Sequence, residues 1–275
     1  MIWLNGKLQE NGVLDATNAA TLLGWGVFTT VGIRDGAPTF LRRHFERLQR
    51  DARAADIEFV WKSQKIEQGL TEVLRAQKVV DGLARLTLTQ RGDGRWKTQI
   101  GADLSIMALA APPQNQPMRA QLSPYRVEAK RPLVGVKTTA YLPYLWAWRE
   151  AKSNGFDEAI MRNGGDFLCE GARSSLFWIE NNELWTSAPQ TGCLLGVGRD
   201  LVLEWARLKQ ISVHEGEFES AKIETAQEIW LVSAAGGVRA VSSWHDENGA
   251  LIWQRCHKTL WQNELLDWWE IQSKV

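Results

Sequence analysis

The residues best suited to carry chemistry are a lysine and a glutamate in apolar surroundings. Lys137 lies beside apolar residues near the end of the segment 134–139, which predicts a strand. A lysine there either extends its amine to water or, when desolvated, becomes a nucleophile that can form a Schiff base. Glu170 follows the apolar residues 167–169 and precedes small residues. It is either a turn acid that accepts backbone hydrogen bonds or a carboxylate directed at a positive partner, such as a pyridinium nitrogen.

Two turns rich in small residues are candidate anion sites. The first, Leu195-Gly196-Val197-Gly198-Arg199, enters a predicted helix whose first N–H groups and dipole favour negative charge. The second, Ser233-Ala234-Ala235-Gly236-Gly237, follows a predicted strand. Neither turn continues into a dinucleotide or P-loop fingerprint, and either can simply connect two elements. Arg47 could add a fixed cation to a phosphate, or it could be a solvated helix arginine.

A further loop, residues 91–97, contains Arg91, Arg95 and Lys97. It is suited to capture a substrate carboxylate, and it is equally compatible with an exposed hairpin tip. The four histidines are scattered without metal-ligand spacing, and no G-x-S-x-G elbow is present. A metal site and a hydrolase triad are therefore not expected.

Helices and strands interleave without a regular βαβ rhythm, which predicts an α+β fold. Apolar spacing predicts helices over residues 41–56, 63–77, 141–153, 200–209 and 256–272 and strands over residues 84–89, 104–110 and 229–234. Asn5-Gly6 and Glu247-Asn248-Gly249 predict hairpin turns. Three prolines within residues 111–117 mark a linker. We therefore expect a smaller N-terminal domain over residues 1–112, a linker over 113–118 and a larger C-terminal domain over 119–275.

Composition limits the class of protein. The 275 residues carry 32 Lys+Arg and 32 Asp+Glu, and a formal net charge of zero argues against a nucleic-acid partner. Three separated cysteines predict neither a disulfide framework nor a zinc site. Residues 1–7 show no signal-peptide pattern, and no apolar run reaches the ~20 residues that a membrane span needs. We expect a cytoplasmic protein without a membrane partner.

The order of these segments resembles the fold-type IV, or class IV, pyridoxal-phosphate enzymes. These include 4-amino-4-deoxychorismate lyases and branched-chain and D-amino-acid aminotransferases. The matching stretches lie across nearly the whole chain, at residues 24–30, 44–48, 137–142, 151–159, 169–177 and 195–199. The resemblance implies a D-amino-acid aminotransferase-like fold, with a small N-terminal α/β domain and a larger C-terminal α+β domain that binds the cofactor. It also implies a homodimer.

The resemblance also implies roles for named residues. Lys137 would be the catalytic Schiff-base lysine and the base that removes the substrate Cα proton, and Glu170 would hold the pyridine nitrogen. The phosphate of pyridoxal 5'-phosphate would be held by Arg47 and by backbone N–H groups of Val197, Gly198 and Ala234. The residues implied for binding an amino substrate with a carboxylate are Phe28, Thr30, Arg95, Lys97 and Tyr141. Many family members have threonine at the positions of Gly198 and Ala234, so two phosphate-binding hydroxyls are absent here.

Two reactions fit this resemblance. A lyase would release pyruvate and 4-aminobenzoate, whereas an aminotransferase would act on branched-chain or D-amino acids. Phe28-Thr29-Thr30 is similar to lyases, because aminotransferases tend to have glutamate at the position of Thr29. A third reading starts from the 15 tryptophans and predicts a binding protein without a cofactor. Most of the tryptophans lie at core spacing, and Trp25 and Trp96 are the two expected to shape a substrate pocket.

Overall fold

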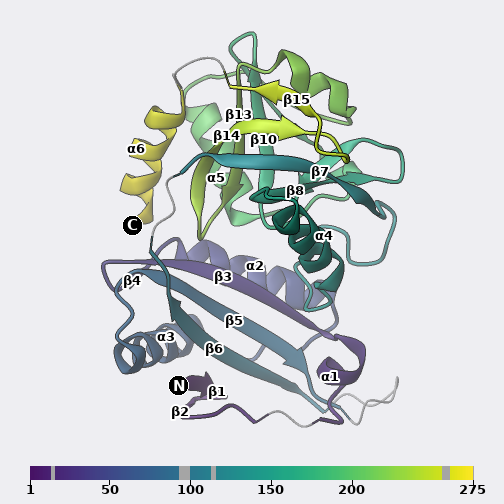
Figure 1. The fold of residues 1–275 in the computed structure, drawn as a ribbon. Coiled ribbons are helices and arrows are strands. Elements are labelled where there is room, and N and C mark those ends of the chain that lie inside the picture. The colour runs from purple at the N-terminus through teal and green to yellow at the C-terminus, as the bar shows by residue number, and fades with distance from the viewer. Residues whose placement is uncertain (14–15, 93–99, 113–115, 256–260, 275) are drawn as a thin grey trace. The chain divides into compact units, whose positions relative to one another are not determined.

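The computed structural model describes residues 1–13, 16–92, 100–112, 116–255 and 261–274. The chain forms two compact units, each with its own sheet (Figure 1). The N-terminal unit comprises Met1–Pro113, Val136–Ala140 and Ser273–Val275, and the C-terminal unit comprises Gln114–Gly135 and Tyr141–Gln272. The short segment Val136–Ala140 therefore leaves the C-terminal unit and returns to it. This path places Lys137 in the N-terminal unit, although the predicted domains assigned it to the C-terminal one.

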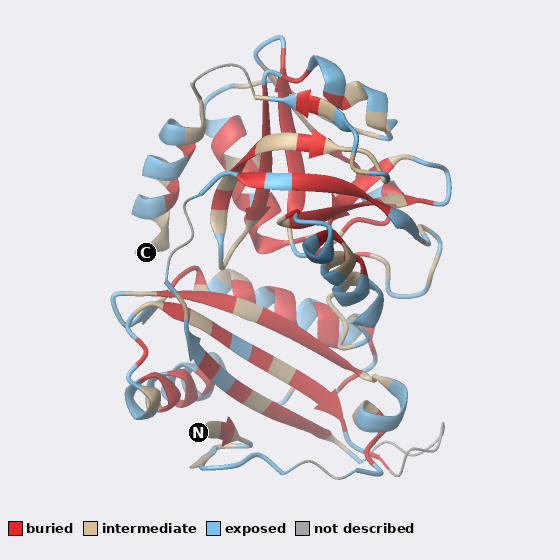
Figure 2. Cartoon of the chain, in the orientation of Figure 1, coloured by how far each residue is buried: buried red, intermediate tan, exposed pale blue. Residues whose placement is uncertain are grey.

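The N-terminal unit is a six-stranded antiparallel sheet in the order β2-β1-β6-β5-β3-β4. Its strands are β1 (Ile2–Leu4), β2 (Lys7–Gln9), β3 (Gly26–Arg34), β4 (Ala37–Pro38), β5 (Gly82–Gln90) and β6 (Ala102–Ala110). Its helices are α1 (Ala19–Leu23), α2 (Leu41–Ala54) and α3 (Ser63–Gln77). β5 and β6 largely alternate between buried and more exposed residues (Figure 2), as expected for strands with one face on a core.

That alternation separates two kinds of side chain. Val27 and Val31 of β3 and Leu86 and Leu88 of β5 belong to the core, together with Leu48 of α2. The intervening residues of β3 and β5 point to the opposite face. They are Phe28, Thr30, Arg85 and Thr87, with Phe28 paired to Thr87 and Thr30 to Arg85. The face away from the core therefore carries two of the predicted substrate-binding residues.

The segment around Lys137 is not the regular strand that residues 134–139 predicted. Gly135 has a φ of +76° and belongs to a turn, which ends any extended run before Val136. The following residues are extended enough to form one antiparallel bridge, between Val27 and Thr138. Two backbone bonds flank it, from Phe28 N to Lys137 O at 2.9 Å and from Thr139 N to Gly26 O at 2.8 Å. The segment thus continues the sheet beside β3 for a few residues only.

The C-terminal unit contains a nine-stranded mixed sheet. The order is β12-β11-β10-β13-β14-β7-β8-β9, and β15 also pairs with β14. The strands are β7 (Met118–Val127), β8 (Glu158–Asn163), β9 (Leu168–Gly171), β10 (Ser175–Glu180), β11 (Glu183–Ser187), β12 (Val213–Gly216), β13 (Glu228–Ser233), β14 (Gly237–His245) and β15 (Leu251–Gln254). The helices are α4 (Leu142–Ser153), α5 (Val197–Leu208) and α6 (Trp261–Ser273), with 3₁₀ turns at Pro189–Thr191 and Ser220–Thr225. The predicted α+β class is confirmed.

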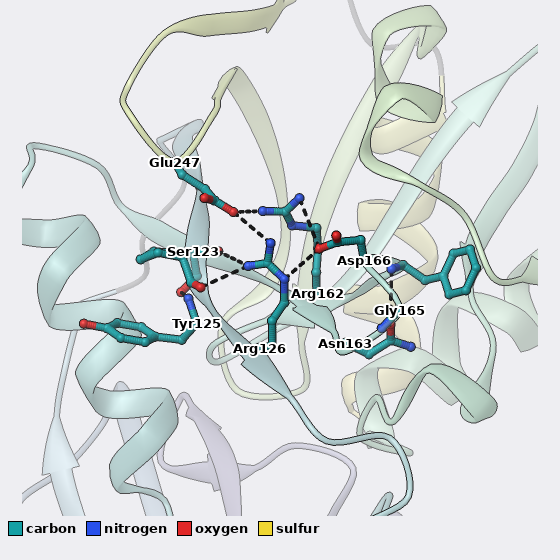
Figure 3. Close-up of polar contacts among 10 residues, drawn as sticks. Ser123, Tyr125, Arg126, Arg162, Asn163, Gly165, Asp166 and Glu247 are labelled. Atoms are coloured by element: carbon teal, nitrogen blue, oxygen red, sulfur yellow. Dashed lines mark hydrogen bonds and ion pairs between the residues drawn. The ribbon is translucent and has the colours of Figure 1, made fainter.

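Four charged side chains connect β7, β8 and the turn between β14 and β15 (Figure 3). Arg126 pairs with Asp166 at 2.8 Å and with Glu247 at 3.0 Å. Arg162 pairs with the same two carboxylates. Two cations and two anions balance one another, so this cluster is an element of the scaffold.

Most tryptophans serve as core residues, as their spacing indicated. The largest fully buried side chains are tryptophans: Trp3, Trp178, Trp205, Trp230 and Trp244. The partly buried Trp25 packs against the N-terminal core, and its indole donates to Ala55 O at 2.8 Å. Trp96 lies outside the described residues. Over the described part of the chain, no helix is both long and apolar enough to cross a membrane.

Candidate functional site

The main chain of Lys137 is held from two directions within the N-terminal unit. Its carbonyl accepts a hydrogen bond from Phe28 N at 2.9 Å, and its N–H donates to Asp51 Oδ2 at 3.2 Å. The half-buried side chain places Nζ 4.8 Å from the centroid of the Phe28 ring. The amine therefore lies over an aromatic face, and the backbone that carries it is fixed by both β3 and α2.

A buried polar cluster lies between β3 and α2, on the core side of β3. Thr29 Oγ1 accepts a hydrogen bond from Arg47 Nη2 at 2.5 Å and lies 2.6 Å from His44 Nδ1. Arg47 also contacts the Phe28 carbonyl at 3.4 Å and lies 3.9 Å from Asp51 Oδ2. Burial and the nearby Arg47 cation lower the pKa of His44 to about 3, so the imidazole is neutral at pH 7. Arg47 is thus a fixed cation rather than the solvated helix arginine that was the alternative.

Arg85 is a residue that the sequence analysis missed. Its guanidinium carbon lies 3.6 Å from the centroid of the Phe28 ring, the same ring that Lys137 Nζ approaches. Its Nε also donates to Thr87 Oγ1 at 3.4 Å. In a strand, an arginine between two core residues, Ala84 and Leu86 here, points away from the core. Combined with the pairing of β3 and β5, that signal could have identified it.

In the C-terminal unit, Glu170 lies within β9 and is only 5% exposed. Oε1 accepts a hydrogen bond from Tyr144 Oη at 3.1 Å, and Oε2 accepts one from Leu194 N at 3.0 Å. Tyr144 Oη in turn accepts from Arg131 Nη2 at 3.0 Å. Burial and the Glu170 carboxylate raise the pKa of Tyr144, so the phenol stays protonated and donates a hydrogen bond to Glu170. Glu170 is thus an oriented buried carboxylate and not a solvent-exposed turn acid.

Tyr141 lies immediately before α4 in the same unit. Its phenol donates to Ala172 O at 2.9 Å, and its ring stacks on Tyr144 at a centroid distance of 4.9 Å. These contacts connect it to the residues that orient Glu170.

The two predicted anion turns are brought together. The N-cap of α5 is Gly196, which has no side chain to accept from the first helical N–H groups. These are the N–H groups of Val197 and Gly198. A Cβ placed on Gly198 would lie 2.9 Å from Ala234 N and 3.0 Å from Ser233 C. The start of α5 therefore touches the turn after β13, and only glycine permits that approach. Three backbone N–H groups of this cradle, those of Val197, Gly198 and Ala234, belong to one small region, which suits an anion such as a phosphate.

The structure therefore collects the predicted residues in two groups. Phe28, Thr30, Arg47 and Lys137 belong to the N-terminal unit, and Tyr141, Glu170, Val197, Gly198 and Ala234 belong to the C-terminal unit. Arg95 and Lys97 lie outside the described residues. Within the described ranges, no cluster of three or more His, Cys, Asp or Glu residues is arranged to hold a metal ion.

Comparison with known proteins identifies the family. The model of the class IV aminotransferases matches residues 26–244. The chain belongs to this family. The resemblance inferred from the sequence is thereby confirmed, together with the enzyme class: a class IV enzyme, lyase or aminotransferase, that uses pyridoxal 5'-phosphate.

The relatives of the chain include both lyases and aminotransferases. It is 26% identical to the aminodeoxychorismate lyase of Bacillus subtilis over 85% of this chain and 83% of that protein. It is 24% identical to the branched-chain-amino-acid aminotransferase of Escherichia coli over 88% of this chain and 84% of that protein. Its fold matches the branched-chain aminotransferase of Thermoproteus uzoniensis with a TM-score of 0.86, at 22% identity and covering 98% and 93% of the two chains.

Proposed function

We propose that Lys137 binds pyridoxal 5'-phosphate covalently and that Glu170 holds the pyridine nitrogen of the cofactor. The phosphate is assigned to Arg47 and to the N–H groups of Val197, Gly198 and Ala234. The donor set fits this molecule, because it supplies an amine, a buried carboxylate and an anion cradle that a Cβ would fill. When bound, the cofactor supplies an electron sink that makes the substrate Cα proton acidic.

The roles of the protein groups follow from their contacts. Lys137 Nζ is the base that takes the Cα proton, and its backbone bonds to β3 and α2 keep it in reach. Glu170 would accept a hydrogen bond from the protonated ring nitrogen. Tyr144 Oη and Leu194 N–H donate to its two oxygens and hold the carboxylate in place. A carboxylate held in this way can keep the proton on the ring nitrogen.

For the substrate, we propose a compound that carries a carboxylate beside the reacting amine. Arg85 and Lys137 Nζ both lie over the Phe28 ring, so the guanidinium is placed to bind a carboxylate near the reacting amine. Thr30 pairs with Arg85 across β3 and β5 and lies on the same face. Phe28 and Thr30 are proposed to form the substrate wall, and Tyr141, Arg95 and Lys97 keep the substrate-binding roles that the resemblance implies.

The lyase reaction, which releases pyruvate and 4-aminobenzoate, is the activity we propose. The observation that carries it is Thr29, whose hydroxyl contacts Arg47 and His44 where aminotransferases tend to have a glutamate. A neutral residue at this position leaves the region around Arg47 more positive than a glutamate would. Aminodeoxychorismate has two carboxylates, so a site that lacks the negative charge of a glutamate here suits it better.

Branched-chain or D-amino-acid transamination is the second candidate. A single carboxylate beside the reacting amine would satisfy Arg85 equally well, and the similarity to the E. coli aminotransferase covers as much of the chain as that to the B. subtilis lyase. We also propose that the protein is a homodimer, as the family resemblance implies. Sedimentation velocity of the purified protein tests this, and a monomer across the micromolar range would contradict it.

The deciding experiment for the reaction uses the purified protein loaded with pyridoxal phosphate. It is incubated with aminodeoxychorismate, and 4-aminobenzoate and pyruvate are quantified against a Lys137→Ala control. Formation of both products that is lost in the control supports the lyase. If neither forms while an amino acid and a keto acid exchange amino groups, the protein is an aminotransferase and the lyase proposal is wrong.

A further inference from the structure

Asp51 is a fully buried carboxylate without a role in the chemistry proposed above. It lies on α2, one helical turn after Arg47, and is 0% exposed. Oδ1 accepts two hydrogen bonds from Arg50, at 3.1 and 3.0 Å. Oδ2 accepts the main-chain N–H of Lys137 at 3.2 Å and lies 3.9 Å from Arg47 Nε. One carboxylate therefore contacts both the lysine and the arginine of the proposed site.

The Lys137 segment is a short, irregular addition to the N-terminal sheet. Val136–Ala140 joins the sheet through a single bridge, between Val27 and Thr138. On the β3 side, the Lys137 carbonyl accepts a hydrogen bond from Phe28 N. Its N–H is turned toward α2, where Asp51 is the acceptor. A charged acceptor makes a stronger hydrogen bond than a neutral one, so this contact is well suited to fix a short irregular segment.

We propose that Asp51 is a positioning residue that sets Lys137 and Arg47 relative to one another. The inference rests on the proposed function, in which the amine and the guanidinium bind an aldehyde and a phosphate of one small, rigid molecule. Such a molecule presents its two groups at a fixed separation, so the protein groups must be held at a matching separation. A carboxylate bonded to the backbone of one and adjacent to the side chain of the other provides that constraint.

Two substitutions separate the parts of this role. Asp51→Asn retains an oxygen that can accept from Lys137 N–H but removes the charge beside Arg47 and Arg50. Asp51→Ala removes both. The matched control is Glu46→Gln on the same helix, because Glu46 is an exposed acid that pairs with the exposed Arg42.

The first measurement is residue-resolved hydrogen–deuterium exchange of the cofactor-free protein, which does not depend on activity. The Lys137 amide of the wild type and of Glu46→Gln should exchange as slowly as the amides of β3. Asp51→Ala should exchange at least about tenfold faster at Lys137, as expected for losing a bond to a charged acceptor, with Asp51→Asn in between. Wild-type exchange at Lys137 as fast as in an exposed loop overturns the proposal without any variant. An unchanged rate in a folded Asp51→Ala protein also overturns it.

The second measurement is a titration with pyridoxal phosphate, followed by the visible absorbance of the bound cofactor. Asp51→Ala should weaken binding about tenfold or more relative to Glu46→Gln, and Asp51→Asn should recover part of the loss. Equal binding by all folded variants overturns the proposal. If the wild type binds no cofactor at all, the proposed function fails instead, and the exchange measurement still decides whether Asp51 fixes the Lys137 backbone.

Discussion

Lowering the pH from 7 to 5 is expected to destabilise the N-terminal unit through one buried histidine. His44 is 1% exposed, contacts Thr29 and has its pKa lowered from 6.5 to about 3 by burial and by Arg47. In the unfolded chain this imidazole binds a proton below pH 6.5, whereas in the folded chain it does not until about pH 3. The unfolded state therefore binds more protons in this window, and stability is lost as the pH falls through it.

The size of the effect follows from the width of that window. Each pH unit below the unfolded pKa costs about 1.4 kcal/mol, so His44 alone should remove about 2 kcal/mol of stability at pH 5. A typical domain is stable by only about 5–15 kcal/mol, so a loss of this size should be readily measured. The variant that tests this is His44→Gln, because glutamine keeps a polar group beside Thr29 but cannot titrate.

The assay is urea unfolding at pH 7 and pH 5 for the wild type and His44→Gln, with hydrogen exchange of α2 peptides reporting on the N-terminal unit. The pH-dependent loss should be about 2 kcal/mol smaller in the variant than in the wild type. Each protein is compared with itself, so a constant cost of the substitution cancels. Equal losses in both proteins would refute the reasoning, because His44 would then titrate alike in the folded and unfolded states.

Three further predictions test other parts of the structure. Tyr144→Phe removes a donor to the Glu170 carboxylate, which costs about 1–3 kcal/mol and should lower kcat/KM about 5-fold to 150-fold in steady-state kinetics; an unchanged kcat/KM would exclude a role for this contact. Burial raises the pKa of Glu158 to about 7 from 4.5, so its contribution to stability is complete below pH 4.5 and is lost as the pH rises through 7. Urea unfolding of Glu158→Gln should accordingly show a smaller loss between pH 5 and pH 8 than the wild type, and parallel curves would contradict this. Gly198→Ala would place a methyl group 2.9 Å from Ala234 N and should weaken pyridoxal phosphate binding about tenfold in equilibrium dialysis, whereas unaltered binding would place the phosphate elsewhere.

Much of the local structure was predictable because it depends on neighbouring residues. The predicted helix over residues 63–77 coincides with α3, and that over 41–56 with α2 (Leu41–Ala54). Asn5 and Gly6 adopt the positive φ values that a tight hairpin requires, and the turn between β14 and β15 contains Gly249 with a φ of +86°. Apolar periodicity and turn-forming residues are short-range signals, so a single sequence is enough to detect them.

The features that could not be predicted from the sequence depend on contacts between residues far apart in the chain. Asp51 and Lys137 are 86 positions apart, so the helix pattern of α2 could not show that Asp51 accepts from the Lys137 backbone. The hydrogen bonds of Tyr144 with Glu170 and with Arg131 likewise join separate segments. The hydrogen bond from the Trp25 indole to Ala55 O also joins residues 30 positions apart.

The most direct test of the central claim is to locate the covalently bound cofactor. The protein is loaded with pyridoxal phosphate, reduced with borohydride, digested and analysed by tandem mass spectrometry. We expect one phosphopyridoxyl group on Lys137, stoichiometric with the protein and absent from Lys137→Ala. Stoichiometric labelling of another lysine, or no labelling of protein that has been shown to be folded, would contradict it.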